Sequence, residues 1–130
     1  MFVSSCSGPA SHGAGHPTLD VTLSDFRIQV SSAGAPAGTV DLLVHNAAPA
    51  THEFVLVRSD LPADQLPIGA DGLSVDEEPL TAVDELSEVD TGETDTLTVP
   101  LTPGRYVFFC NLEGHYLGGM HGVLVVSADG

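Results

Sequence analysis

Short runs in which apolar and polar residues alternate occupy most of this chain, and alternation with period two is typical of half-buried β-strands. "LDVTL" at 19–23 and "TVDLLVHN" at 39–46 show the pattern clearly, and the turn signal Pro103-Gly104 opens another such run. The predicted strands are 19–23, 26–30, 39–46, 52–58, 95–101, 104–110 and 121–127. We therefore predict an all-β fold, an antiparallel β-sandwich of seven or eight short strands, rather than alternating strands and helices.

The first 17 residues, "MFVSSCSGPASHGAGHP", lack this periodicity and are rich in Ser, Gly, Ala and Pro. Such a composition predicts a flexible tail or linker at 1–17, which leaves 18–130 as a single domain. "VSSC" resembles the end of a bacterial lipoprotein signal, in which Cys6 would carry the lipid, although the charged and apolar regions expected before it are missing. We interpret the stretch as a trimmed signal with a lipid anchor at Cys6; the alternative is an accidental match.

The chain is strongly acidic, with 18 Asp and Glu residues against Arg27, Arg58 and Arg105, no lysine, and a formal net charge of −15. We therefore do not expect nucleic acids or anionic lipids as partners, because both are bound through Lys and Arg. Residues 59–95 hold 12 of the acidic residues and no basic one. We interpret this segment as a long surface excursion with a helical turn near 84–88, which promotes solubility or steers a basic partner. No apolar run reaches the roughly 18 residues needed to cross a bilayer.

The stretch "CNLEGHYLGGMHG" at 110–122 concentrates potential metal ligands. Cys110, His115 and Met120 follow one another with the spacing Cys-x4-His-x4-Met, and the glycines between them permit a tight loop. Cys110 ends an apolar strand, so its thiol is expected at the end of a largely apolar surface. A fourth ligand must come from elsewhere in the fold. His52 is the best candidate, because it opens a predicted strand directly after a turn.

One Cys, two His and one Met form a diagnostic ligand set. A trigonal His₂Cys plane with a weak axial Met is a blue-copper electron-transfer site. The thiolate stabilises the cuprous ion, imidazole suits both oxidation states, and the weak thioether bond lets the geometry change little when an electron moves. The sequence therefore predicts one copper ion held by His52, Cys110, His115 and Met120.

Other interpretations of these residues are less consistent with the sequence. A Cys₂His₂ zinc site needs a second nearby thiol, and Cys6, which we do not expect to form a disulfide, is far away. A dinuclear copper site needs a second cysteine where Gly114 stands, and a hydrolytic cysteine needs an exposed thiolate. His121 competes with Met120, but neighbouring residues on an extended chain point to opposite sides. His45 is predicted to lie on the surface face of its strand.

The sequence resembles the cupredoxin family. The resemblance rests on "VHNAAPATHEFVLV" at 44–57 and "GRYVFFCNLEGHYLGGMHGVLVV" at 104–126, with a ligand-loop spacing similar to that of rusticyanin. It implies a Greek-key β-sandwich with copper at one end and electron transfer through His115. The residues near the ring edge of this histidine would form an apolar docking patch of Gly114, Tyr116 and Leu117.

The chain departs from the family pattern beside two ligands: Glu53 stands where many members have Asn, and Asn111 where many have Ser or Thr. We predict that Glu53 accepts a hydrogen bond from Asn111 or a neighbouring backbone N–H.

The function predicted from the sequence is that of a monomeric one-electron carrier. It would work outside the cytoplasm, exchange electrons with redox proteins that present a basic docking surface, and have no catalytic turnover of its own. The alternatives are a copper-trafficking or copper-buffering protein that uses the same site, and a domain that docks to a larger oxidase or reductase.

Overall fold

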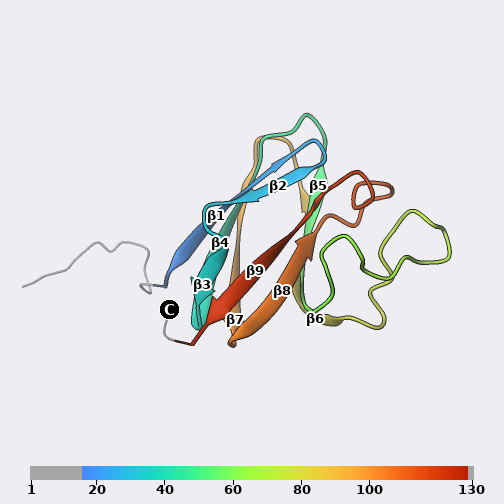
Figure 1. Ribbon diagram of the computed structural model, residues 1–130. Coiled ribbons are helices and arrows are strands. Elements are labelled where there is room, and N and C mark those ends of the chain that lie inside the picture. The colour runs from blue at the N-terminus through green and yellow to red at the C-terminus, as the bar shows by residue number, and fades with distance from the viewer. Residues whose placement is uncertain (1–15, 129–130) are drawn as a thin grey trace, which may run out of the picture.

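Nine strands form two β-sheets that pack against each other in the computed structural model, which describes residues 16–128 (Figure 1). The first sheet has the order β2 (Arg27–Val30), β1 (Thr18–Ser24), β4 (Gly38–Asn46) and β7 (Thr94–Leu101). The second has the order β3 (Gly34–Pro36), β9 (His121–Ser127), β8 (Gly104–Phe109), β5 (His52–Arg58) and β6 (Thr81–Val89). Within 16–128 there is no α-helix, and hence none that could cross a membrane. The predicted all-β sandwich is confirmed.

Two features of the sheets differ from the prediction. The sandwich is not purely antiparallel, because β1 pairs with β4 and β3 pairs with β9 in parallel. The helical turn predicted near 84–88 is wrong, since Thr81–Val89 forms β6 and pairs antiparallel with β5. β6 is an edge strand in which only Val89 is fully buried, so its sequence carries little alternation and backbone pairing decides its conformation. β3 lies between two predicted strands, in a stretch for which no strand was predicted, and pairs with the last strand.

The main core lies between the two sheets. Alternate residues of β4 point into it, namely Val40, Leu42, Val44 and Asn46. Asn46 is polar and fully buried, and its side chain satisfies three hydrogen bonds across the turn that follows β4. Its amide donates to the carbonyls of Ala50 (2.8 Å) and Val89 (2.7 Å), and its oxygen accepts the N–H of Ala48 (2.9 Å). This network fixes the turn that delivers His52 to the start of β5.

A second apolar cluster covers the outer face of the five-stranded sheet. It joins β5 and β8 to the segment 59–80 and to the loop after β8, through Val55, Val57, Leu66, Val75, Val107, Phe109 and Tyr116. β5 and β8 are therefore buried on both faces, which explains their nearly continuous apolar sequences. The predicted excursion is correct for 59–80, which crosses the surface without regular strands, and this segment packs on the sheet (Figure 1).

Two of the three arginines anchor the start of this segment. Arg58 donates to Thr102 Oγ1 (2.6 Å), to the carbonyl of Pro103 (2.7 Å) and to Tyr106 Oη (2.9 Å). Arg105 donates to the carbonyls of Ser59 and Leu61.

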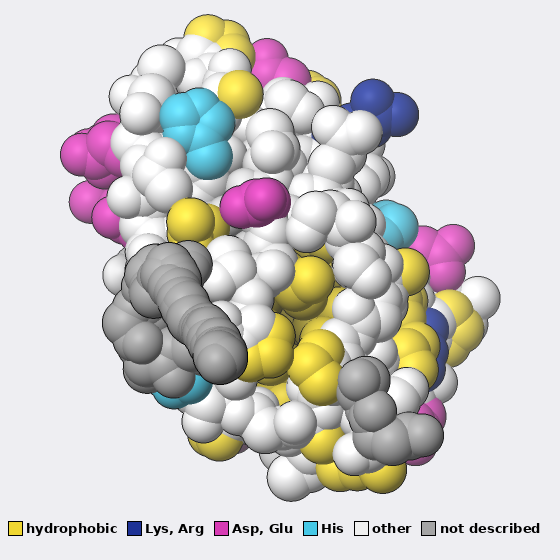
Figure 2. Space-filling view, turned by 90° about the vertical axis from the view of Figure 1, so that its left-hand side faces the viewer, with side chains coloured by type: hydrophobic (Ala, Val, Ile, Leu, Met, Phe, Trp, Pro, Cys, Tyr) yellow, Lys and Arg dark blue, Asp and Glu magenta, His cyan; other side chains and the backbone are white. Residues whose placement is uncertain are grey.

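Hydrophobic side chains gather in one part of the face drawn in Figure 2. Acidic groups are scattered over its upper half, and hydrophobic ones gather in its lower half, at the end of the sandwich away from the ligand loop (Figure 2).

Candidate metal centre

The predicted ligand loop connects β8 to β9 and is closed by its own backbone. Cys110 follows β8 directly, and its N–H donates to the carbonyl of Met120 (3.1 Å) at the other end of the loop. The N–H of Met120 in turn donates to the carbonyl of His115 (3.2 Å), and that of His115 to the carbonyl of Leu112 (2.9 Å). Gly114 adopts a φ of 78°, a conformation that side-chain-bearing residues rarely take. The loop thus holds its three predicted ligands in fixed relative positions.

Three of the four predicted donors converge at one point of the fold. The Nδ1 atoms of His52 and His115 lie 3.1 Å apart, and the sulfur of Cys110 lies 3.8 Å from His52 Nδ1 and 3.5 Å from His115 Nδ1. His52 and Cys110 are 1% and 0% exposed, whereas His115 is half-buried. The structure therefore brings together a histidine from the start of β5 and two residues from the loop after β8.

The dimensions of this donor triangle fit a single ion. Bonds of about 2.0–2.1 Å to nitrogen and about 2.3 Å to sulfur, at angles of about 100–120°, separate two nitrogens by about 3.1–3.6 Å. The same bonds separate sulfur from nitrogen by about 3.3–3.8 Å. The observed distances of 3.1, 3.5 and 3.8 Å lie within these ranges. A thiolate with two imidazoles and an available thioether is a copper ligand set rather than a zinc one.

Met120 completes the set by position. It is fully buried, belongs to the same core cluster as Cys110, and is tied through its backbone to both loop ligands. The neighbouring His121 lies outside the donor cluster and packs its ring against Tyr116, with ring centroids 5.1 Å apart. His45 is exposed and bonds Thr94 through Nδ1 (2.8 Å), as expected for a surface residue.

Burial sets the protonation of the ligands. Burial raises the pKa of the Cys110 thiol, an effect partly offset by the backbone N–H groups of Leu112 and Glu53, the latter 3.3 Å from the sulfur. Burial also lowers the pKa of His52, as does the neighbouring His115, whereas Asp25 raises it. At neutral pH the metal-free site therefore holds a neutral thiol and a neutral His52.

The two departures from the family pattern connect the strand of His52 to the ligand loop. Burial raises the pKa of the Glu53 carboxyl, and the backbone N–H of Asn111 partly offsets this effect, as expected if the predicted contact forms. The Asn111 side chain instead reaches the segment 59–80, which we call the acidic segment. It accepts the N–H of Val75 (2.7 Å) and donates to the Val75 carbonyl (3.1 Å) and to the Glu77 carboxylate (2.7 Å). Asn111 thereby holds the segment 59–80 against the ligand loop.

One predicted member of the docking patch is misplaced. Tyr116 is only 3% exposed, because its ring enters the second apolar cluster. Its hydroxyl donates to the Ala63 carbonyl (2.6 Å) and accepts the Leu66 N–H (3.0 Å). An exposed residue and a buried one look alike in a loop without periodicity, so no sequence pattern indicated this burial.

The apolar rim of the site includes residues that sequence reasoning missed. Leu117 is 54% exposed, as predicted. Phe26 is 52% exposed, and its ring centroid lies 5.5 Å from that of His115. Leu73 is also exposed, and its backbone carbonyl accepts the Gly114 N–H (3.0 Å). We call Phe26, Leu73 and Leu117 the apolar rim. Its first two members are distant from His115 in sequence, and only the fold brings them close.

A two-sheet β-sandwich with Cys, His and Met side chains at one end has the fold and the ligand set of a type 1 copper protein. The chain belongs to the cupredoxin-like domain family, whose sequence model matches residues 1–126. A search of curated protein sequences found no significant match.

Solved structures with the same fold include blue copper proteins. Auracyanin from Roseiflexus castenholzii shares 23% identity with a TM-score of 0.62, covering 85% of this chain and 96% of that chain. Auracyanin A, a "blue" copper protein from Chloroflexus aurantiacus, shares 20% identity with a TM-score of 0.62, covering 87% and 100%. Rusticyanin from Thiobacillus ferrooxidans shares 19% identity with a TM-score of 0.63, covering 87% and 79%. At these identities the similarity concerns the fold.

Proposed function

We propose that this protein is a mononuclear type 1 copper protein that carries single electrons between redox partners. The observation that carries the proposal is the convergence of His52 Nδ1, Cys110 Sγ and His115 Nδ1 at distances that suit one ion, beside a fully buried Met120. A copper ion bound there supplies a reversible one-electron couple.

The protein's own residues hold the donors rigidly and exclude water. The backbone hydrogen bonds between Cys110, His115 and Met120 keep the loop closed. The N–H of Glu53, 3.3 Å from the sulfur, donates to the thiolate. Because these contacts are made within the protein itself, the site needs little rearrangement when the charge changes. The half-buried His115, inside the apolar rim, offers the exit path for the electron.

The burial of the donors favours a carrier over a copper-trafficking or copper-buffering protein. Ligand exchange with another protein requires accessible donors, whereas Cys110 and Met120 are 0% exposed and His52 is 1% exposed. We expect a fast and reversible redox couple. Slow redox chemistry, together with ready transfer of copper to another apo-protein, would support the trafficking function.

Absorption and electron-spin-resonance spectra of the copper-loaded protein test the proposal. We expect an intense sulfur-to-copper visible band that Cys110→Ser abolishes. Cys6→Ser is the matched control, because it removes the only other cysteine and should leave the band unchanged. Survival of the band in Cys110→Ser would refute the site.

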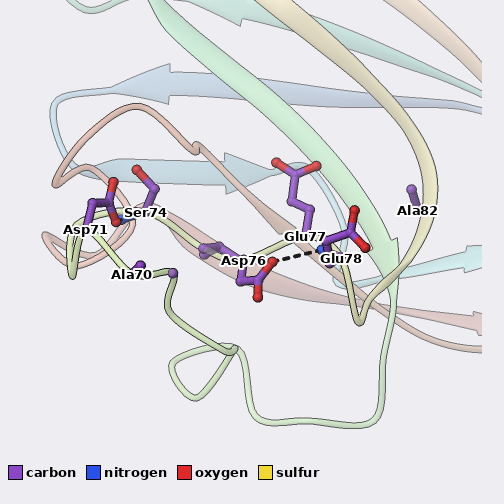
Figure 3. A pocket seen from close by; sticks show the side chains of 9 residues that line it. Ala70, Asp71, Ser74, Asp76, Glu77, Glu78 and Ala82 are labelled. Carbon is purple, nitrogen blue, oxygen red and sulfur yellow. Dashed lines mark hydrogen bonds between the residues drawn. The ribbon is translucent and has the colours of Figure 1, made fainter.

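We also propose that the redox partner presents a basic surface around an apolar centre. In support, the net charge is −15, and Arg58 and Arg105 are engaged by backbone carbonyls. A shallow pocket of the acidic segment carries four carboxylates, with Asp76 accepting the Glu78 N–H at 3.1 Å (Figure 3). Its acidic members are Asp71, Asp76, Glu77 and Glu78.

Stopped-flow electron transfer with a cationic redox protein tests this docking surface. The association rate constant should fall steeply between low and physiological ionic strength. The double variant Asp76→Asn/Glu78→Gln should lower it at low salt, whereas Asp20→Asn, on β1 of the other sheet, should have a smaller effect. A flat salt response would contradict electrostatic steering.

Finally, we propose that the protein works as a monomer outside the cytoplasm, anchored by a lipid on Cys6. The support is the "VSSC" stretch alone, which lies outside the described residues. Mass spectrometry of protein expressed from the full gene tests the anchor, and an unmodified Cys6 would refute it.

A further inference from the structure

The two-residue turn between β1 and β2 lies against the metal centre without supplying a ligand. Its members are Asp25 and Phe26, and each faces a different histidine. Asp25 Oδ1 is 3.7 Å from Nε2 of His52. The ring of Phe26 meets that of His115 edge-on, with centroids 5.5 Å apart and an interplanar angle of 82°. This turn comes from the first sheet, whereas the ligands belong to the second sheet and its loop.

The ring of His52 has one nitrogen without a partner. Its Nδ1 points at His115 Nδ1 and the Cys110 sulfur, so the neutral ring that offers Nδ1 to a metal carries its proton on Nε2. Nε2 is buried and forms no hydrogen bond among the described residues. A buried N–H without an acceptor is unfavourable. Metal-bound histidines almost always donate this second N–H to a carboxylate, a carbonyl or water. The Asp25 carboxylate lies just beyond hydrogen-bonding distance.

Phe26 occupies a conformation that a bulky residue rarely adopts. Its φ is 58°, the left-handed region, although the side chain is 52% exposed and core packing does not account for it. The ligand loop is shaped around it. A Cβ added at Gly118 would lie 2.8 Å from Cδ1 of Phe26, and one at Gly119 would lie 3.3 Å from the Phe26 carbonyl oxygen. The close approach of this turn to the ligand loop therefore requires glycine on one side and an unusual backbone on the other.

We propose that the Asp25–Phe26 turn is a positioning element for both histidine ligands. Asp25 accepts the Nε2–H of His52 and so fixes the tautomer that leaves Nδ1 free for the metal. Phe26 fixes the ring plane of His115 by packing edge-on against it. Neither residue touches the metal, and the inference rests on the copper site proposed above. The hydrogen bond to the carboxylate also makes the His52 ring more basic and so a stronger ligand for the metal through Nδ1.

Copper affinity tests the role of Asp25. The apo-protein is titrated with Cu(I) against a chromophoric chelator of known affinity. We expect Asp25→Ala to weaken binding by about 10–100-fold, the usual effect of losing a residue that supports a metal ligand. Asp25→Asn keeps an oxygen acceptor without the charge and should fall between Ala and wild type. Glu113→Gln removes an equal charge from an exposed position in the ligand loop and should stay within about twofold.

A second measurement separates positioning from a general structural role. In the diamagnetic Cu(I) protein, nuclear magnetic resonance follows the Nε2–H of His52 directly. We expect this proton to exchange with solvent faster in Asp25→Ala and Asp25→Asn than in Glu113→Gln. Unchanged affinity and unchanged exchange in the Asp25 variants, with a wild type that binds copper normally, would overturn the role of Asp25. A wild type that binds no copper would refute the copper site instead.

Phe26→Gly tests the other half of the turn. Glycine suits a φ of 58°, so this variant relaxes the backbone and should fold with unimpaired stability. We expect the ring signals of His115 to broaden in the Cu(I) protein, because the edge-on contact is lost. Sharp and unshifted His115 signals in a folded Phe26→Gly protein would overturn the role of Phe26.

Discussion

Replacing Tyr116 by Phe removes a single hydroxyl group from the contact between the ligand loop and the acidic segment. The hydroxyl donates to the Ala63 carbonyl (2.6 Å) and accepts the N–H of Leu66 (3.0 Å). The ring itself packs edge-on against Phe109, with centroids 6.0 Å apart, and Phe can retain this packing. The substitution therefore isolates the two hydrogen bonds from the apolar contact.

The expected loss of stability follows from the burial of the two partners. Leu66 is only 4% exposed, so its N–H is left buried without an acceptor, which costs about 1–3 kcal/mol. Ala63 is half-buried, and its carbonyl can turn to water at little cost. We expect the free energy of unfolding to fall by about 2 kcal/mol. For a domain of this size that lowers Tm by roughly 5–10 °C.

Denaturant unfolding of the apo-protein measures the free energy, and amide hydrogen exchange locates the change. The Leu66 amide should exchange much faster in Tyr116→Phe. Tyr106→Phe is the matched control, because its hydroxyl also bonds the backbone, accepting the Thr102 N–H (3.0 Å), but at the other end of β8. That variant should lose less stability, because Thr102 is exposed and its N–H can turn to water, and it should leave the Leu66 amide protected.

Two results would refute this reasoning. The first is a change in unfolding free energy below about 0.5 kcal/mol, the size expected for a surface substitution. The second is an unchanged exchange rate at Leu66, which would mean that the hydroxyl does not hold the acidic segment.

Three further predictions concern the ligand loop. Asn111→Ala removes the contacts to Val75, so the Val75 amide should exchange faster while the visible band persists. An exchange rate equal to that of the wild type would show that Asn111 does not hold the segment 59–80 against the ligand loop. Met120→Leu should raise the reduction potential and keep the colour, and voltammetry showing an unchanged potential would exclude Met120 as an axial ligand. Burial raises the pKa of Cys110, so copper binding at pH 7 should release about one proton, which a pH-stat titration measures, and the apparent copper affinity should rise with pH. If no proton is released, Cys110 is already a thiolate in the apo-protein.

The stability of the apo-protein should depend on pH through His52. Burial lowers its pKa from 6.5, so the folded state favours the neutral ring, and this contribution is present above pH 6.5 and lost as the pH falls through the lowered value. Copper should protect against the loss, because the metal competes with the proton. Unfolding free energies at pH 5 and 7, with and without copper, measure both effects. Equal acid sensitivity of the apo and copper-loaded forms would contradict a ligand role for His52.

Local patterns were sufficient for much of the fold. The alternation in 39–46 placed Val40, Leu42 and Val44 on one buried face, because a strand beside a single core repeats every two residues. The same rule failed for β6, an edge strand whose sequence has weak alternation and whose conformation comes from pairing with β5. Local patterns also could not predict the parallel pairing of β1 with β4, since this pairing depends on how distant strands assemble.

The sequence by itself determined the chemistry of the site. The spacing of Cys110, His115 and Met120 in one glycine-rich loop restricts both the ligand set and the metal, because ligand type decides copper over zinc. Only the tertiary structure decided what surrounds these ligands. It brought His52 Nδ1 to 3.1 Å from His115 Nδ1, buried Tyr116, and set Asp25 beside the unpaired nitrogen of His52. These contacts join strands and turns that are distant along the chain, and such contacts form only when the two sheets pack together.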